Sequence, residues 1–276
     1  MKLSVFSVFT CACLAVFAAP ATSVAFAEEV GNTANSDYFF TLDPNKVHAS
    51  PTFSLASPSG LTPFQKVAFV GIGGIKDMPG RRDTTVDGAM STGFGFALSE
   101  KDKIGMLVGL DLGSINPSDG GAFNRGDLGL TIGKYFDDYN TGVSLGIKNI
   151  SLWYSAAGKN TPSVYIAATK IAMLGEYRTI MNLGFGNNAF RTLNDTGTKS
   201  ERSQRASMFG SVAIYPLPQL SLVVDYTAGI TSVGAGVVPV AAWPVSLSLG
   251  LYDVTKAIQG HDKTSLIASL GYSYSF

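Results

Sequence analysis

The segment Leu270-Gly271-Tyr272-Ser273-Tyr274-Ser275-Phe276 places three aromatic residues at alternate positions. Because successive side chains of a strand point to opposite faces, the three rings share one face, and Gly and Ser occupy the other. We expect Phe276 to end the last strand of the fold. A soluble protein has little reason to align three rings in this way, whereas aromatic girdles lie at both interfaces of a transmembrane β-barrel. The segment therefore predicts a lipid-facing strand.

These last residues resemble the C-terminal signature that Gram-negative outer-membrane barrels present to their assembly machinery, with Tyr272, Tyr274 and Phe276 as its aromatic positions. The chain also loosely resembles uncharacterised outer-membrane proteins, chiefly over residues 52–153. That second resemblance rests on residues 53–60, 94–96 and 125–130, and it implies no known activity. Together they imply a location in the bacterial outer membrane, with outer-membrane lipid, lipopolysaccharide and the barrel assembly machinery as partners.

The first 27 residues have the features of a secretory signal peptide. Met1-Lys2 gives a basic start, residues 5–19 are mostly apolar, and Ala25-Phe26-Ala27 is a small-residue cleavage site. Cys11 and Cys13 both lie within this segment. The mature chain is therefore expected to contain no cysteine, which excludes thiol catalysis and Cys-ligated metal sites.

The composition of the 276-residue chain suits a barrel wall. Its 20 basic and 20 acidic residues balance, so there is no electrostatic footprint for nucleic acid. Charged residues make up 14% of the chain, against about 25% in a typical soluble domain. The 31 glycines and the many aromatic residues suit a wall between lipid and a narrow lumen.

Alternation of apolar with small or polar residues predicts an all-β fold. It is clearest in residues 90–98, 104–113, 127–133, 220–227 and 266–276. Short turns alternate with longer polar loops, which is the arrangement of outer-membrane barrels. We predict an antiparallel transmembrane β-barrel of about 12 strands. Because residues 163–173 and 230–242 alternate weakly, 10 or 14 strands remain alternatives, and a secreted β-sandwich is the main rival fold.

The uncharged run from Thr227 to Tyr252 is long enough to suggest a membrane-spanning helix. Its interior Pro239 and Pro244 and its alternating end instead predict two strands and a turn. We divide the chain into a signal peptide (1–27), an arm (28–64) and a barrel (65–276). The polar arm is expected to be a flexible periplasmic segment or one inserted into the lumen, with plain disorder as the alternative.

Strand parity predicts which charged side chains face the lumen, because an ionised Arg or Lys facing lipid costs about 2–4 kcal/mol at mid-membrane. The predicted lumen-lining residues are Asp111, Asp127, Lys148, Lys170, Arg178, Arg205 and Asp225. They could line a water-filled pore, or they could pair across the lumen and close it. No cluster has metal-ligand spacing, and we expect no metal, no cofactor and no catalytic residue.

We expect a monomeric, non-enzymatic, porin-like channel for passive diffusion of small hydrophilic solutes. The alternative is a closed barrel that serves as a structural or surface-interaction protein, with loop 187–204 as its contact. A weaker alternative is a lipid-modifying hydrolase that uses His261 with Ser265. His48 lies in the arm and carries no role in this prediction.

Overall fold

Twelve β-strands account for almost all regular structure in the computed structural model, which describes residues 49–77, 86–113, 122–154, 161–191, 207–258 and 263–276. The strands are β1 (Val67–Lys76), β2 (Val86–Ser99), β3 (Ile104–Gly113), β4 (Arg125–Phe136), β5 (Thr141–Tyr154), β6 (Ser163–Leu174), β7 (Tyr177–Gly186), β8 (Ser207–Leu217), β9 (Leu220–Thr227), β10 (Ile230–Val237), β11 (Val245–Tyr252) and β12 (Ser265–Ser275).

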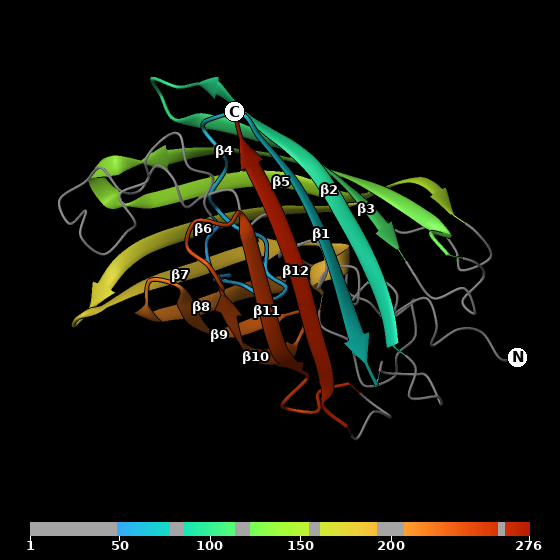
Figure 1. Ribbon diagram of the computed structural model, residues 1–276. Coiled ribbons are helices and arrows are strands. Elements are labelled where there is room, and N and C mark those ends of the chain that lie inside the picture. The colour runs from blue at the N-terminus through green and yellow to red at the C-terminus, as the bar shows by residue number, and fades with distance from the viewer. Residues whose placement is uncertain (1–48, 78–85, 114–121, 155–160, 192–206, 259–262) are drawn as a thin grey trace, which may run out of the picture.

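Each strand pairs antiparallel with its neighbours in sequence, and the sheet closes into a barrel (Figure 1). Closure is made by β1 and β12, whose register joins Val67 to Ser275 and Lys76 to Leu266. The predicted 12-strand antiparallel barrel is therefore confirmed. The two weakly alternating segments, 163–173 and 230–242, contain β6 and β10.

The two ends of the barrel differ. One, here called the turn end, carries short connections such as residues 100–103, the 3-10 helix Asp137–Tyr139 and residues 218–219. The other, the loop end, carries the predicted long loops, which the described residues cover only in part. It also holds the tight β9–β10 turn, where Ala228 and Gly229 both have positive φ angles. Positive φ at both central positions matches the twist of a two-residue hairpin.

Side chains alternate between a buried inner face and an exposed outer face. In β6, for example, Tyr165 and Ala167 are buried, while Val164 and Ile166 between them are exposed. The exposed positions of the strands are mostly large apolar residues. The uncharged run Thr227–Tyr252 contains β10, β11 and the connection between them. No helix in the described part of the chain is long and apolar enough to cross a membrane.

The aromatic residues of the last strand lie on the outer face at the turn end. Tyr272, Tyr274 and Phe276 are all exposed. The Phe276 ring lies 6.0 Å from Tyr274 and 5.7 Å from Phe94 of β2. The backbone N–H of Phe276 donates to the Lys66 carbonyl. These contacts extend the aromatic face of β12 across the strand pair that closes the barrel.

Residues 49–64 precede β1 and lie inside the ring of strands (Figure 1, blue). Nearly all of them are buried, although they form no regular secondary structure. We call this segment the plug. Its position creates a physical demand, because the buried N–H and C=O groups of irregular backbone must find hydrogen-bond partners in the wall or in side chains of the plug itself.

Candidate functional site in the lumen

The first half of the plug is bound along β8 and β9. The Tyr215 hydroxyl donates to the Pro51 carbonyl at 3.1 Å, and the Ser211 hydroxyl donates to the Phe53 carbonyl at 2.9 Å. The Ser221 hydroxyl donates to the carbonyl of the intervening residue, Thr52. Inward side chains of the wall thus satisfy three successive carbonyl groups of the plug, as buried polar backbone requires.

Asp225 of β9 holds the turn of the plug. Its Oδ2 accepts hydrogen bonds from the Ser54 hydroxyl at 2.7 Å and from the backbone N–H groups of residues 55–57 at 3.0, 3.1 and 3.1 Å. Its Oδ1 accepts from the hydroxyls of Ser57 at 3.0 Å and Thr227 at 2.9 Å. Successive N–H groups around one oxygen make an anion-binding nest. Because charge-assisted hydrogen bonds are stronger than neutral ones, Asp225 is the main polar anchor of the plug.

The second half of the plug is bound to β5, β6 and β7 by neutral groups. The Thr169 hydroxyl accepts from the Gly60 N–H at 2.8 Å and donates to Asn182 Oδ1 at 2.7 Å. The Asn182 amide donates to the Pro58 carbonyl at 2.7 Å, and the Ser144 hydroxyl donates to the Ser59 carbonyl at 2.7 Å. The plug therefore has a charged anchor on β9 and a neutral one on β5, β6 and β7.

Glycines of the wall make room for the plug. A Cβ at Gly105 would overlap the Pro63 carbonyl, and one at Gly236 would overlap the Thr52 backbone. Plug residue Gly60 is equally constrained, because a Cβ there would overlap the backbone of Gly142 and Thr169. These positions explain part of the glycine content by close backbone approach between plug and wall.

Apolar contacts add to the polar ones. Phe53, Leu55 and Leu61 of the plug belong to one buried cluster with inward side chains of the wall, among them Ile180 and Val223. The plug carries no charged residue. Apart from the Asp225 carboxylate that it encloses, it therefore places only neutral groups in the lumen.

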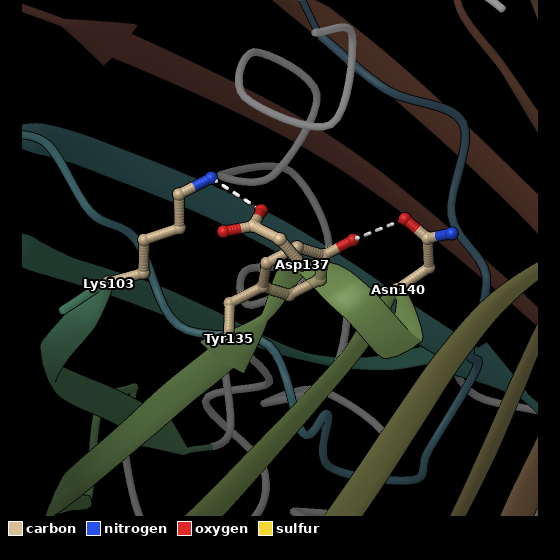
Figure 2. Close-up of polar contacts among 4 residues, drawn as sticks. All are labelled: Lys103, Tyr135, Asp137 and Asn140. Atoms are coloured by element: carbon tan, nitrogen blue, oxygen red, sulfur yellow. Dashed lines mark hydrogen bonds and ion pairs between the residues drawn. The ribbon is translucent and has the colours of Figure 1, made fainter. Parts of the chain in front are cut away.

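Where the plug leads into β1, a small polar group lies at the turn end (Figure 2). The Tyr135 ring packs against Phe64 with centroids 5.8 Å apart, and its hydroxyl donates to Asn140 Oδ1 at 3.5 Å. Beside it, Lys103 Nζ pairs with Asp137 Oδ1 at 2.6 Å. The pair is partly exposed, so it contributes little to stability.

Nearer the loop end, a buried aromatic cluster lies on the inner face of the wall. Phe190, from the 3-10 helix Asn188–Phe190, packs on Phe209 with centroids 4.7 Å apart and on Tyr165 at 5.7 Å. Lys148 Nζ lies 5.3 Å from the centre of the Phe190 ring, within cation–π range. The Tyr165 hydroxyl is hydrogen-bonded to Thr131 at 2.6 Å.

The structure separates the predicted lumen-lining residues. Asp225, Asp127 and Lys148 are buried, with 1%, 1% and 6% of their surface exposed. Asp111 is the cross-strand partner of Asp127. Asp127 Oδ1 accepts from the Ser151 hydroxyl at 2.8 Å. Asp111, Asp127 and Lys148 belong to β3, β4 and β5, respectively, away from the nest around Asp225 on β9.

The two remaining described residues of the set differ in placement. The Arg178 guanidinium is partly buried and lies 5.5 Å from the Tyr215 ring centre. Lys170 is exposed between buried Thr169 and Ile171, so it lies on the outer face, and its predicted inward orientation is wrong. Lys170 lies near the turn end of β6, where its Nζ reaches the Tyr139 carbonyl at 2.7 Å. A long side chain can thus carry its charge to the turn end from an outward position.

Several predicted features lie outside the described residues. They include Arg205, His48, His261, residues 1–27 and most of the loop 187–204. Ser265, the proposed partner of His261, donates its hydroxyl to the Asp77 carbonyl at 2.8 Å. Within the described part, no three His, Cys, Asp or Glu side chains gather as metal ligands would.

Sequence reasoning identified Asp225 as an inward carboxylate but did not identify what it binds. For residues 28–64 the sequence allows a periplasmic segment, a lumen-inserted segment or disorder. One signal favoured insertion: the sequence has no Asp, Glu, Lys or Arg between Lys46 and Lys66. A solvated arm usually carries charges, whereas a segment packed inside a barrel avoids them.

No family model and no curated protein matches the chain. Solved structures with a similar arrangement include an outer membrane channel from Pseudomonas putida F1, with 14% identity, 84% of this chain and 100% of that chain covered, and a TM-score of 0.45. Wzi, a carbohydrate-binding outer-membrane β-barrel of Escherichia coli, has 10% identity, 69% and 52% coverage and a TM-score of 0.29.

Proposed function

We propose that the chain is a transmembrane β-barrel of a bacterial outer membrane. Three features support this proposal. The barrel is closed, so it leaves no sheet edge to lipid. Its outer face is largely apolar, and its strand number is even, as in single-chain bacterial barrels. By analogy with such barrels, the turn end would face the periplasm and the loop end the exterior.

We further propose that the protein is a channel for small hydrophilic solutes that the plug holds closed. The wall behind the plug carries this proposal. It presents polar side chains that could form hydrogen bonds with water as readily as they now form them with the plug. These side chains are Ser144, Thr169, Asn182, Ser211, Ser221, Asp225 and Thr227. Between these polar positions the wall also buries apolar side chains, such as Ile180 and Val223, which pack against the plug. Withdrawal of the plug would expose a passage that these polar side chains line in part.

Solute entry into liposomes tests the channel. We expect Asp225→Asn to raise the swelling rate of liposomes in small sugars several-fold over the wild type, because the neutral amide weakens the nest. Asp138→Asn is the matched control, since Asp138 is exposed in a turn. An Ala56→Cys reporter in the plug, labelled by a charged maleimide, shows whether the plug has moved. Labelling without added swelling would refute the channel.

The second candidate is the closed barrel with a structural or surface role. The apolar cluster around Phe53 and Leu61 favours it, because burial of apolar surface keeps a plug in place. If the Asp225→Asn variant neither labels nor conducts, this candidate replaces the first. The loop 187–204 would then be the segment to delete in a surface-binding assay.

A further inference from the structure

The outer wall has an apolar trough on one side of the barrel, separate from the lumen. Its volume is about 1190 Å³, and it is lined by residues of β10, β11, β12, β1 and β2. A smooth convex wall would offer no such hollow. Its origin can be followed in the strand register.

One cross-strand row forms the floor of the trough. Gly88 pairs with Gly74, Gly74 with Ala268, Ala268 with Leu249, and Leu249 with Ala235. Directly paired residues share a face, and the exposure of Leu249 shows that this face is the outer one. Four of the five positions are Gly or Ala. The row therefore lacks the side-chain volume that neighbouring rows carry.

Larger side chains form the sides of the trough. Toward the turn end, the next row pairs Ile72 with Leu270, Leu270 with Leu247 and Leu247 with Val237, and all four residues are exposed. Toward the loop end, Val86 borders the floor. With strands about 4.8 Å apart, a row of five strands is about 19 Å long. Because barrel strands tilt by about 35–45°, the row runs obliquely around the wall, and an acyl chain can lie along it.

Two lysines lie at the loop end of this sector. Lys76 belongs to the row next to the floor, where it pairs with Val86 and Leu266, and its side chain is exposed. Lys263 lies just before β12 and is also exposed. Both lie at the loop end, above the trough. An apolar trough below two lysines complements a lipid with an apolar chain and an anionic headgroup.

We propose that this trough binds a lipopolysaccharide molecule, with an acyl chain on the Gly88–Ala235 row and a phosphate near Lys76 and Lys263. The assignment of the lipid follows from the end of the barrel at which the lysines lie, because the long loops of outer-membrane barrels face the exterior. It therefore rests on the proposed membrane location and orientation. It does not depend on whether the lumen conducts.

Native mass spectrometry of the full chain, purified in mild detergent and titrated with lipopolysaccharide, tests the proposal. We expect one retained molecule per chain and at least a tenfold loss of retention in Ala268→Phe, which fills the floor. Ala168→Phe is the matched control, because Ala168 is exposed on β6, outside this sector. Both substitutions face outward and leave the lumen unchanged.

The headgroup contact is tested separately. Lys76→Gln with Lys263→Gln should reduce lipopolysaccharide retention several-fold and leave retention of a zwitterionic phospholipid unchanged. Three results would overturn the proposal: equal retention by Ala268→Phe and Ala168→Phe, no retention by the wild type, or preferential retention of phospholipid over lipopolysaccharide. Conductance of the same samples shows separately whether the channel assignment holds.

Discussion

The two halves of the plug are held by different chemistry. Residues 51–57 close around a carboxylate that accepts six hydrogen bonds, whereas residues 58–63 bind a neutral threonine, asparagine and serine and lie close to wall glycines. Both halves accept hydrogen bonds from neutral hydroxyl groups and lie close to wall glycines, but only the first half encloses a charged group. The difference implies that loss of one anion should free the first half, while the second half should be sensitive to added volume.

Asp225→Ala should have the largest effect. It removes the acceptor of three buried N–H groups, each of which costs about 1–3 kcal/mol when left unsatisfied. The free energy that holds the first half should fall by at least about 3 kcal/mol, which is roughly a 100-fold change in an equilibrium constant. Maleimide labelling of Ala56→Cys should accelerate accordingly.

A Leu61→Cys reporter in the second half sharpens this result. We expect its labelling to rise less than that of Ala56→Cys, because Thr169 and Asn182 still hold the neighbouring backbone. Equal acceleration at both reporters would mean that the plug leaves as one unit and that the two halves are not independent.

Gly60→Val should have the next largest effect, and chiefly on the second half. The added side chain would overlap the backbone of Gly142 and Thr169, and overpacking typically costs about 1–3 kcal/mol. Labelling of Leu61→Cys should rise more than labelling of Ala56→Cys. Gly109→Ala is the control, because its new Cβ would meet no atom closer than 3.9 Å.

Thr169→Val removes one neutral hydroxyl group and leaves the shape of the side chain nearly unchanged. The Gly60 N–H and the Asn182 side chain each lose a partner, so we expect a loss of about 1–3 kcal/mol in the second half. Thermal unfolding in detergent and Leu61→Cys labelling measure it. If Thr169→Val releases the plug more than Asp225→Ala does, the contrast between charged and neutral anchors is wrong.

Lys103→Ala should have the smallest effect. The Lys103–Asp137 pair lies at the turn end, with 26% and 44% of the side-chain surfaces exposed, and exposed pairs typically contribute about 0–1 kcal/mol. Labelling of both reporters should stay within a few-fold of the parent value. A large increase would show that this pair, rather than the lumen contacts, retains the plug.

Much of the barrel could be predicted from the sequence because each half-buried strand repeats the same period of two. The alternation in residues 104–113 and 220–227 predicted β3 and β9, and it also predicted that Asp225 faces the lumen. Strand parity predicted the wrong face for Lys170, whose long side chain lies on the outer face and reaches the Tyr139 carbonyl at the turn end. Near a strand end, a charged residue can lie on either face of the sheet, so its charge does not predict the face.

The plug could not be derived in the same way. Its hydrogen bonds to the wall join residues that are 85 to 171 positions apart, such as Ser59 with Ser144 and Ser54 with Asp225, and no local period encodes them. The trough was also hidden, because its floor is a row across five strands that exists only once the register is fixed. Single glycines such as Gly74 gave no sign of it in sequence.

A reversible disulfide between plug and wall tests the central claim most directly. The Ser57 and Thr227 hydroxyl oxygens lie 2.7 Å apart, so Ser57→Cys with Thr227→Cys should form a bond that locks the plug in the lumen. Single-channel recordings in a planar bilayer should be silent when the pair is oxidised and show discrete openings after reduction, and each single-cysteine variant should ignore the redox change. Openings in the oxidised pair equal to those seen after reduction would contradict a lumen closed by residues 49–64.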